Sequence, residues 1–590
     1  MLINALFCIH LSTGFKQKNR KILCVWYKYS QNSSNIEINL PEYVFNILSD
    51  IQSIGGRALI VGGAVRDAIL GKKSKDIDFE VYRVSYEDLT NILNNYGKAD
   101  LVGKAFGVIK FVGPDGADFD FSLPRTDSKS GVGHKDFDVT VSSDLTPAEA
   151  AGRRDFTINA ISYDPLTHEI IDPYNGQLDL KNKVLRHVSD SFAEDPLRVL
   201  RGMNFVGRFS ERICNECGNK MVLKSNNGTN KYICSSCGGS NFHYDGFNLA
   251  PETAELAKSI KDQYQHLPKE RIEGEFKKLV QKGVEPGRAL DYLYDTGWSE
   301  NFPHIHNLQN VEQEPEYHPE IWLTDHTKYV MNEAARVADE NDLSINDREV
   351  LIYAALAHDF AKPATTKIIN KKGIDRITSH GHEEQGGPMA REFLESIGVN
   401  KTIIDQVVPL VENHLNHIHY SHSNNKDSFV KQLAERLHPS NIRMLHHLIE
   451  SDHSGRPPLP KGVPSQAKEM VDHSNVHGVF NAKHPDFLQG RDVIEYTGRK
   501  GDAFVGNGLK EHRKKLLNHD QDMLDSQAAR KWLDARMQKE VSLINGNDVM
   551  NILGIKGAGI KNVLNDAWSA QKQGAFYDKA GALKWLEGKI

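Results

Sequence analysis

The stretch from Leu59 to Val81 constrains the fold and the chemistry of this chain more than any other. It contains an apolar run, the pair Gly62 and Gly63, a short helix, and a second apolar run with the motif Asp76-x-Asp78. Paired glycines let the backbone turn tightly and expose N–H groups where phosphate binds. The alternation of acidic and apolar residues from Asp76 onward predicts a strand with its carboxylates on one face. The combination suits a divalent metal that bridges a triphosphate, and a plain turn with a solvated strand face is the alternative.

The length and composition predict several domains in a reducing compartment. At roughly 150 residues per domain, the 590 residues correspond to about four domains. The net charge of −6 means that a nucleic-acid partner would be held by local basic patches. Four of the six cysteines form one cluster, which favours a cytoplasmic location. The apolar residues 2–9 are too short to span a bilayer, so no membrane partner is expected.

Two further strands are expected between residues 103 and 127, separated by the turn sequence Gly-Pro-Asp-Gly. The second strand carries Asp118 and Asp120 on one side. Asp120 is the better candidate for a third carboxylate beside the first two. Residues 128–138, rich in Ser, Gly and Lys, are expected to form a mobile loop.

A basic motif follows this loop. Arg153, Arg154 and Asp155 precede an apolar stretch, where they would supply cations for phosphate and a partner for a ribose hydroxyl. A charged helix start without a ligand is the alternative.

The segment after Ala193 predicts a helix that opens at Glu194 and Asp195, with Pro196 in its first turn. At a spacing of three, Asp195 and Arg198 would share a helix face. One acceptor and one donor match the amino group and ring nitrogen that cytosine and adenine both present, and would refuse uracil and guanine. A simple intrahelical ion pair is the alternative.

Six motifs occur in order between residues 40 and 290: LIVGGAVRDAILG, KDIDFEV, RRDFTINA, IIDPYNGQLDLKNKVLRHV, EDPLRVLR and PKERIEGEF. Together they resemble the class II tRNA nucleotidyltransferases, which are CCA-adding enzymes, and the related bacterial poly(A) polymerases. The resemblance implies an α+β fold, with a DNA polymerase β-like nucleotidyltransferase head followed by all-α neck, body and tail regions. It also implies two-metal nucleotidyl transfer with Mg²⁺, in which a tRNA 3′-hydroxyl attacks the α-phosphate of CTP or ATP.

The resemblance assigns roles to individual residues. Asp76 and Asp78 would bind the metals, and Asp120 would complete the catalytic carboxylates. The residues expected to bind the nucleotide are Gly62, Gly63 and Arg66 for the triphosphate; Arg154, Asp155 and Asn159 for ribose and phosphate; Asp195 and Arg198 for the base; Arg201 from the same motif; and Glu270 and Arg271 as support from the neighbouring helix.

The family pattern is interrupted after Phe209 by a cysteine-rich insertion. Its four cysteines have the spacing C-x2-C-x16-C-x2-C, and each pair is followed by glycine. This spacing predicts a structural Zn²⁺ site, because thiolates on two turns can close on one ion. Two disulfides or an iron–sulfur site are the alternatives. Because the two ends of the insertion must lie close together, we expect a self-contained zinc ribbon. The predicted ligands are Cys214, Cys217, Cys234 and Cys237.

A second chemistry is predicted downstream of the body helices. His326, the doublet His358-Asp359, and Asp452 lie in segments of helical periodicity. Four N and O ligands suit a divalent transition metal and an activated water.

This pattern resembles the HD phosphohydrolase domain of one subgroup of bacterial CCA-adding enzymes. The resemblance implies that these four residues are metal ligands, with Ni²⁺ as one candidate ion, and that His382 and Lys362 lie near the phosphate. It also implies 2′,3′-cyclic phosphodiesterase, 2′-nucleotidase and phosphatase activities. Four later histidines are spaced too irregularly to assign: His414, His417, His419 and His422.

The C-terminal region contains an apparent duplication. Segments that start at Leu488 and Ile544 align through three pairs of residues, Gly490 with Gly546, Asp492 with Asp548, and Trp532 with Trp585. The second copy resembles the tail helices that clasp the tRNA elbow in the family. A helical end module without RNA contact is the alternative.

The expected organisation has six parts: an N-terminal extension (1–39), the head (40–190), neck and body helices (191–315), the ribbon within the neck (211–246), the HD domain (316–458) and a helical C-terminal region (459–590). The predicted function is addition of CCA to tRNA from CTP and ATP by a monomer or a dimer, with a separate phosphohydrolase activity. A poly(A) polymerase is one alternative, which the HD domain, the tail and the lack of a basic terminal tract disfavour. An RNA-binding protein active only as an HD phosphohydrolase is the other, and the three head carboxylates argue against it.

Overall fold

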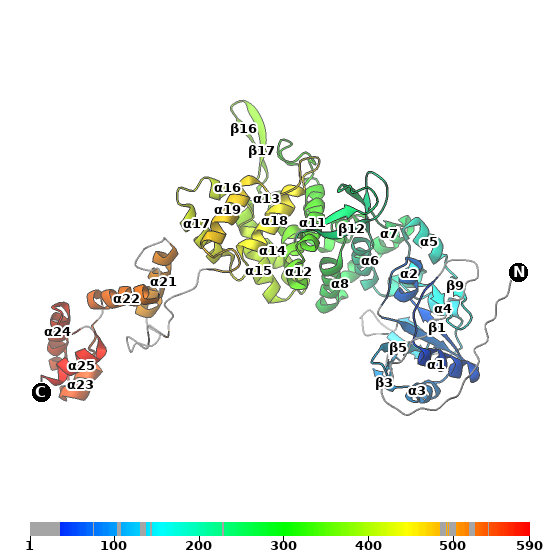
Figure 1. Ribbon diagram of the computed structural model, residues 1–590, viewed down its shortest axis with the longest axis horizontal. Coiled ribbons are helices and arrows are strands. Elements are labelled where there is room, and N and C mark those ends of the chain that lie inside the picture. Colours follow the sequence, from blue (N-terminus) through cyan, green and yellow to red (C-terminus); the bar gives the residue numbers. More distant parts are fainter. Residues whose placement is uncertain are drawn as a thin grey trace, which may run out of the picture. The chain divides into compact units, whose positions relative to one another are not determined.

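The protein is described by a computed structural model. It covers residues 36–74, 76–102, 108–129, 137–141, 144–226, 229–483, 491, 494, 503–517, 526–540, 542–576 and 578–589. The chain divides into two compact units, Met1–Asp195 and Pro196–Ile590 (Figure 1). The first unit contains the largest sheet, and the second is mainly helical.

The first unit is built on a seven-stranded sheet with the order β3-β4-β5-β2-β1-β8-β9. β2 and β5 are parallel, whereas β1 pairs antiparallel with β2 and β8, and β4 pairs antiparallel with β3 and β5. The strands are β1 (Arg57–Val61), β2 (Asp78–Tyr82), β3 (Lys98–Val102), β4 (Val108–Val112), β5 (Asp118–Ser122), β8 (Ser162–Tyr163) and β9 (Ile170–Ile171).

Buried apolar residues on both faces of the sheet form the core of this unit. Phe79 of β2 and Phe121 of β5 are fully buried, and their rings stack with centroids 4.7 Å apart. The amphipathic helix α1 packs on β1 and α3. Other elements of the unit are α1 (Glu42–Ser53), α2 (Gly63–Ile69), α3 (Tyr86–Asn94), α4 (Pro147–Ala151), η1 (Thr157–Asn159), α5 (Gly176–Asn182), β10 (Val184–Leu185) and η2 (Asp190–Glu194).

The structure corrects two expectations about this sheet. The strand that was expected to include Asp76 begins at Asp78, because its partner β1 ends opposite that residue and the chain then turns at Gly62. The expected loop 128–138 is partly wrong as well. Its ends belong to an antiparallel hairpin of β6 (Arg125–Lys129) and β7 (Phe137–Val141), and residues 130–136 lie outside the described part of the chain.

The second unit begins with neck and body helices that are interrupted by a small ribbon. Trp298 is fully buried among these helices, and its indole N–H donates to the Ala257 carbonyl at 2.8 Å. The helical elements are α6 (Leu197–Arg208), α7 (Pro251–Ser259), η3 (Lys261–His266), α8 (Lys269–Lys282), α9 (Arg288–Asp295), η4 (Trp298–Asn301) and α10 (Pro303–His306). The strands are β11 (Glu211–Cys214), β12 (Met221–Asn226), β13 (Thr229–Cys234), β14 (Phe242–Asp245) and β15 (Asn248–Leu249).

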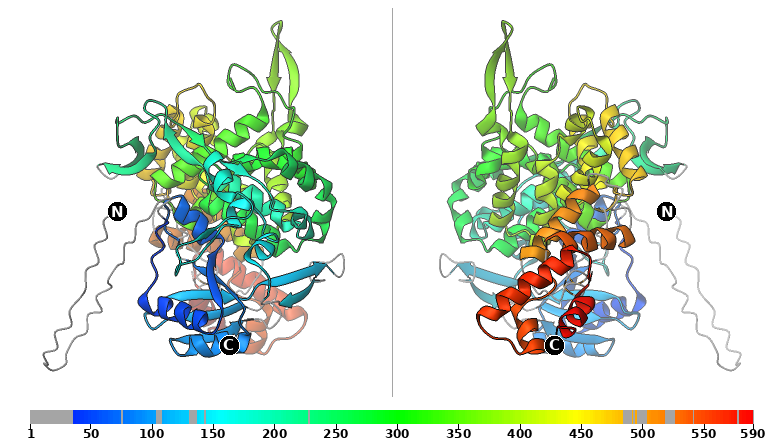
Figure 2. Two further views of the ribbon diagram at one scale, coloured as in Figure 1. Left: turned by 90° about the vertical axis from the view of Figure 1, so that its right-hand side faces the viewer. Right: turned by 90° about the vertical axis from the view of Figure 1, so that its left-hand side faces the viewer.

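A helical bundle follows the body. It carries one hairpin, β16 (Lys367–Lys371) with β17 (Ile374–Thr378), which projects from the helices in Figure 1 and in both views of Figure 2. The helices are α11 (Leu323–Glu340), α12 (Ile345–Ala357), α13 (Lys362–Thr365), α14 (His382–Ser396), α15 (Lys401–Glu412), α16 (Asn416–Ser421), α17 (Lys426–Leu437), α18 (Ile442–Ser454) and α19 (Ser465–Val476).

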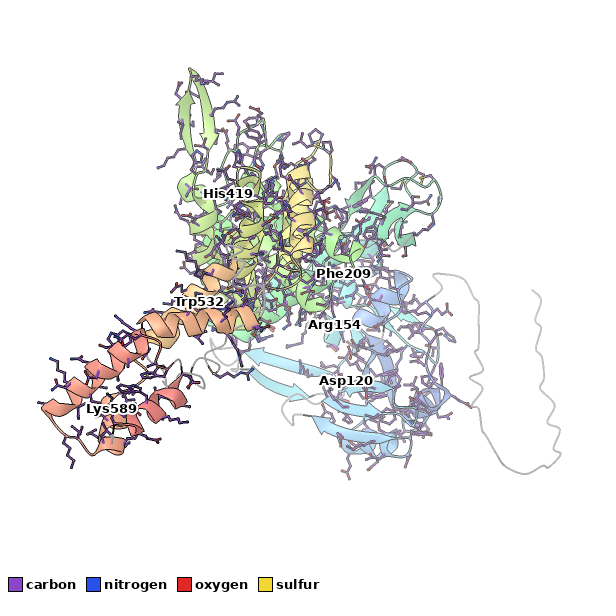
Figure 3. All side chains as sticks on the ribbon, turned by 60° about the vertical axis from the view of Figure 1, so that its left-hand side comes forward. Asp120, Arg154, Phe209, His419, Trp532 and Lys589 are labelled. Carbon is purple, nitrogen blue, oxygen red and sulfur yellow. The ribbon has the colours of Figure 1, made fainter. Side chains whose placement is uncertain are left out.

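The C-terminal helices share one hydrophobic core, to which both proposed repeats contribute. Trp532 and Trp585 are both partly buried against it, and Figure 3 labels Trp532. Leu488, Gly490 and Asp492 of the first repeat lie outside the described residues. The helices are α21 (Ala503–Leu517), α22 (Ser526–Glu540), α23 (Gly546–Leu553), α24 (Ala558–Lys572) and α25 (Lys579–Glu587). No helix in the described ranges combines the length and apolar character needed to cross a membrane.

Candidate active sites and metal centres

The glycine pair at the end of β1 forms a turn beneath two guanidinium groups. Gly62 has a φ of +71°, a conformation that favours glycine. A Cβ atom on Gly62 would lie 3.3 Å from Arg154 Nη1, and one on Gly63 would lie 3.4 Å from Arg66 Nη2. The two guanidinium groups therefore lie against the backbone of the turn, an arrangement suited to anionic oxygens.

A hydrogen-bond chain fixes one of these cations. Arg66 donates from Nη1 to Asn159 Oδ1 at 2.6 Å and from Nε to Asp67 Oδ1 at 2.8 Å. Asn159 in turn donates from Nδ2 to Asp155 Oδ1 at 2.9 Å. The structure thus brings together Arg66, Asp155 and Asn159, which the sequence placed in one nucleotide site from positions far apart in the chain.

The acidic side of the head site consists of carboxylates on adjacent strands. Asp78 and Asp120 face each other in register across the parallel pair β2 and β5. Burial raises the pKa of Asp78, the nearby carboxylates of Asp120 and Asp76 raise it further, and Arg154 opposes the shift. Carboxylates that disfavour each other's ionisation have the chemistry of a divalent-cation site. Figure 3 labels Asp120 and Arg154 in the head.

The proposed base-reading residues are arranged differently from the prediction. Helix α6 begins at Leu197 with Pro196 as its N-cap, and Asp195 has extended backbone angles. The expectation that Asp195 and Arg198 share a helix face is therefore wrong. The reason is that a residue before proline is excluded from the α conformation by steric clash.

The other residues of this predicted set lie on two packed helices. Arg198 and Arg201 are half-buried residues of α6. Glu270 and Arg271 lie in the first turn of α8, which packs against α6. Helix α8, which carries Glu270 and Arg271, thus packs against the helix that it was expected to support.

The four predicted HD ligands converge at one point of the helical bundle. His326 comes from α11, His358 and Asp359 from the end of α12, and Asp452 from α18. His326 Nε2 lies 3.2 Å from Asp452 Oδ1 and 3.3 Å from His358 Nε2. His358 Nε2 lies 3.1 Å from Asp359 Oδ2. His326, His358 and Asp452 are close enough to hold one ion.

A second group of ligands shares Asp359 with the first. His382 Nε2 lies 3.2 Å from Asp359 Oδ1 and 3.2 Å from His414 Nε2. The two oxygens of Asp359 thus face different histidine pairs, a geometry that can bridge two cations. His414 was left without a role by its spacing, and the available signal was a histidine just beyond the apolar helix α15.

The ligand histidines are oriented by one repeated contact. In His358, His382 and His414, Nδ1 donates to the carbonyl three residues earlier, at 2.8, 2.7 and 2.6 Å. A proton on Nδ1 leaves Nε2 free to bind metal. In His326, Nδ1 instead lies 2.8 Å from Glu320 Oε1.

The environment of Asp359 fits a cation. The residue is 1% exposed, and both carboxylate oxygens lack a well-directed hydrogen bond among the described residues. Lys362, which the resemblance places near the phosphate, has its Nζ 2.8 Å from Oδ2. A buried carboxylate with unused lone pairs favours a metal partner.

The four cysteines of the ribbon also converge. Cys214 Sγ lies 3.5 Å from Cys237 Sγ, and Cys217 Sγ lies 3.3 Å from Cys234 Sγ. These distances exceed a disulfide bond, and all four thiols are free. All four sulfur atoms lie within 4.8 Å of one another, as a shared ion requires.

Both cysteine pairs form the same turn. Gly218 and Gly238 have φ values of +73° and +78°. Their N–H groups donate to the carbonyls of Cys214 and Cys234 at 3.0 and 2.9 Å. Glycine after each pair is therefore explained by the positive φ that closes the turn.

The ribbon is anchored to the HD helix α11, which the prediction of a self-contained ribbon did not include. Arg212 is 6% exposed, lies 4.2 Å from the centre of the Tyr232 ring, and pairs with Asp339 of α11 at 3.3 Å. Tyr232 donates its hydroxyl to Asp339 Oδ2 at 2.8 Å. Lys231 pairs with Glu340 at 2.8 Å. The same helix carries His326.

Three family models match the chain: the poly A polymerase head domain over residues 58–186, the probable RNA and SrmB-binding site of polymerase A over 246–309, and the HD domain over 323–450. The multifunctional CCA protein of Xanthomonas campestris pv. campestris is 31% identical over 449 residues, which are 74% of this chain and 95% of that protein. The chain belongs to the multifunctional CCA protein family. The multifunctional CCA protein of Actinobacillus pleuropneumoniae serotype 5b is 34% identical over 359 residues, which are 60% of this chain and 74% of that protein.

Solved structures confirm the predicted fold class of this chain. A Bacillus stearothermophilus CCA-adding enzyme in complex with CTP matches with a TM-score of 0.51 and 20% identity, over 84% of this chain and 96% of that one. The apo form II of a CCA-adding enzyme matches with a TM-score of 0.52 and 16% identity, over the same shares. Residues 211–245 of the ribbon lie between the first two family-model matches.

Proposed function

We propose that this protein adds C, C and A to the 3′ ends of tRNA, using CTP and ATP, and that its HD site separately hydrolyses phosphate esters of nucleotides or RNA ends. The observation that carries the first activity is the register pair Asp78 and Asp120 in the same head as the Gly62–Gly63 turn with its two arginines. The HD activities we propose are those of a 2′,3′-cyclic phosphodiesterase, a 2′-nucleotidase and a phosphatase.

In the head, each group has a distinct task. Gly62, Gly63 and Arg66 hold the triphosphate, while Arg154, Asp155 and Asn159 contact ribose and phosphate. Asp76, Asp78 and Asp120 would hold divalent ions, for which we propose Mg²⁺ because hard carboxylate oxygens suit it. Such ions supply charge that stabilises the transferred phosphate and the leaving pyrophosphate.

Base selection is assigned to the start of α6. Asp195 and Arg198 present an acceptor and a donor to cytosine or adenine, with Arg201 on the same helix. Glu270 and Arg271 on α8 support this helix. The extended backbone of Asp195 places this residue outside helix α6.

The HD site would take one or two transition-metal ions on its histidines, with Ni²⁺ as a candidate for the set His326, His358, Asp359 and Asp452. His382 and His414 would hold the second ion together with Asp359. Lys362 balances the charge of Asp359, and the Nδ1 contacts keep the rings aimed at the ions.

For the ribbon we propose one structural Zn²⁺ on Cys214, Cys217, Cys234 and Cys237. Two N–H groups of the second turn, those of Cys237 and Ser236, lower the pKa of Cys234 to about 6, which favours the thiolate. Metal analysis of the wild type and of Cys234→Ser tests this: the variant should lack one Zn²⁺ equivalent. An unchanged Zn²⁺ content would exclude the site.

The deciding experiment supplies purified protein with tRNAs that end before CCA, after CC, and after CCA, together with each labelled nucleotide. We expect two CMP and one AMP on the first tRNA, AMP alone on the second, and nothing on the third. Repeated AMP addition to any RNA would instead identify a poly(A) polymerase. Hydrolysis of 2′,3′-cyclic nucleotides without any nucleotide addition would leave the HD activity as the only enzyme function.

Free thiols in the ribbon fit a reducing compartment, and we propose the cytoplasm. A monomer and a dimer remain the two candidate states, which light scattering distinguishes.

A further inference from the structure

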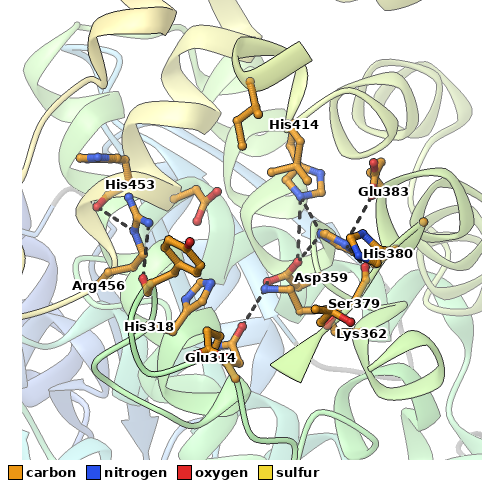
Figure 4. Close-up of a pocket in the computed structure, with 18 of the residues that line it drawn as sticks. Glu314, His318, Asp359, Lys362, Ser379, His380, Glu383, His414, His453 and Arg456 are labelled. Atoms are coloured by element: carbon orange, nitrogen blue, oxygen red, sulfur yellow. Dashed lines mark hydrogen bonds and ion pairs between the residues drawn. The ribbon is translucent and has the colours of Figure 1, made fainter. Parts of the chain in front are cut away.

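The HD pocket has a wall that neither group of metal ligands uses. The cavity measures about 550 Å³, a volume within the range of small-molecule sites. Figure 4 shows Arg456 and His453 on one side of it, and Asp359, His380 and Glu383 on the other. Tyr317, whose main-chain carbonyl accepts from Arg456, also lines the cavity.

Arg456 is a cation that lines this pocket and whose contacts are with main-chain carbonyls. It follows α18 by two residues, and its guanidinium donates only to main-chain carbonyls in the described part of the chain, those of His453 and Tyr317, each at 3.4 Å. In the same ranges no carboxylate lies within ion-pair distance of it. Lys362, the other cation of the pocket, is already bound to Asp359 at 2.8 Å and to Gln313 at 2.6 Å.

The position of Arg456 links it to the metal ligands. Asp452, one of these ligands, lies in the last turns of α18 four residues before Arg456, and both residues line the same cavity. A guanidinium near the reacting centre and without a carboxylate partner matches the planar oxygen pairs of a phosphate.

Tyr317 adds a flat apolar surface beside this cation. Its side chain is 59% exposed although it lines the cavity, and its main-chain oxygen accepts from Arg456. Ile418, which also lines the cavity, is 44% exposed. Exposed aromatic rings are the usual platforms for nucleobases, because every base has a π face.

We propose that Arg456 and Tyr317 form the substrate-binding wall of the HD site: the guanidinium binds the phosphate of the substrate, and the Tyr317 ring stacks on its nucleobase. This assignment rests on the proposed phosphohydrolase function. It selects a nucleotide or an RNA end over a phosphate ester without a base.

The test combines two variants with two ligands on the full-length, metal-loaded protein. Arg456→Ala should weaken the binding of inorganic phosphate, measured by calorimetry, by about tenfold or more, and raise the KM for a 2′,3′-cyclic nucleotide by a similar factor. Tyr317→Ala should raise that KM by about fivefold or more but change phosphate binding by less than about twofold. Metal content should stay at the wild-type value in both variants.

Arg443→Ala is the matched control, because Arg443 is an arginine of α18 that pairs with Asp347 at 3.1 Å and does not line the pocket. Arg456→Lys should bind phosphate more tightly than Arg456→Ala but more weakly than the wild type. A lysine keeps the positive charge but cannot donate two parallel hydrogen bonds to a phosphate as a guanidinium does. Unchanged phosphate binding in Arg456→Ala would overturn the role of Arg456. An unchanged KM in Tyr317→Ala would overturn the base platform.

Phosphate binding can be measured without turnover. It therefore tests the binding wall of Arg456 and Tyr317 separately from the proposed phosphohydrolase function. A wild-type protein that hydrolyses none of the substrates would refute the proposed HD function, while loss of phosphate binding in Arg456→Ala would still support the wall. Normal hydrolysis with no effect of either substitution would refute the wall and leave the function standing.

Discussion

The two candidate metal sites of this protein differ in the type and the burial of their ligands. In the head, Asp76 lies just before β2 and Asp78 is its first residue; both keep solvent-accessible surface, and the charge of Arg154 acts on Asp78. In the HD domain, His326, His358 and Asp359 are almost completely buried. Open oxygen ligands suit a hydrated ion that arrives with a nucleotide, whereas buried imidazoles suit a resident ion.

The two chemistries are separable in this protein. The head carboxylates lie on strands of one compact unit and the HD ligands on helices of the other. Substitution of either set should therefore remove one activity and spare the other, and each variant is the control for its counterpart.

The largest effect is expected for Asp78→Ala. This change should lower nucleotide addition by about 1,000-fold or more, because it removes one of the two facing carboxylates. Hydrolysis of a 2′,3′-cyclic nucleotide should stay within about twofold of wild type. Labelled CMP incorporation and cyclic-nucleotide hydrolysis are measured in parallel.

Asp118→Ala is the matched control, because Asp118 is an exposed residue of the same strand β5, two positions from Asp120. It should retain addition. Addition by Asp78→Ala at more than a few per cent of wild type would contradict the head assignment.

The next largest effect is expected for His358→Ala, which should impair the HD site and spare the head. His358→Ala should lower HD hydrolysis by about 100-fold or more, because this ring lies 3.3 Å from His326 Nε2 and 3.1 Å from Asp359 Oδ2, and should leave CCA addition within about twofold. His422→Ala, a substitution of an exposed histidine that does not line the pocket, is the control.

His414→Ala sharpens this result. If two ions bind, it should lose one metal equivalent, because His414 and His382 share one oxygen of Asp359. Full metal content in His414→Ala would show that the second group holds no ion.

The sequence predicted those parts of the two sites that depend on local patterns. The alternation from Asp78 to Val81, the glycine at a positive φ, and the C-x2-C-Gly turns each require specific residues within a few positions. The resemblance to the family then assigned Asp155 and Asn159 to the same nucleotide site as Arg66, although Arg66 is about 90 residues earlier in the chain.

The missed features depend on tertiary packing. His382 and His414 meet because α14 packs against α15, and no spacing rule encodes that contact. The contact of Arg212 with Asp339 joins the ribbon to a helix more than 100 residues away. The start of α6 was misplaced although Pro196 excludes a helical residue before it, so this signal was available.

A smaller effect is expected at the base-reading position. Asp195→Ala should reduce the preference for CTP over UTP by about tenfold, since a polar site loses an acceptor that only one of the two bases satisfies. The rate of addition with CTP should fall by a smaller factor than the preference for CTP over UTP. Full discrimination in this variant would place base selection on other residues.

The smallest effects concern the contact between the ribbon and α11, which ties an element outside the family pattern to the HD site. Arg212 is buried and stacked on Tyr232, so Arg212→Ala should weaken the anchoring of the ribbon by about 2 kcal/mol. Lys231 is 59% exposed in its side chain, and its partner Glu340 also binds Arg336, so Lys231→Ala should cost about 0.5 kcal/mol or less.

Hydrogen exchange of α11 measures both changes, with faster exchange expected in Arg212→Ala than in Lys231→Ala. Because α11 also carries His326, Arg212→Ala should lower HD hydrolysis by about threefold while nucleotide addition stays constant. Asp339 keeps its ion pair with Arg348, so the substitution leaves no unpaired buried carboxylate to unfold the domain. Equal exchange in both variants would show that the ribbon rests on α11 without supporting it, and the HD site would then depend only on its own helices.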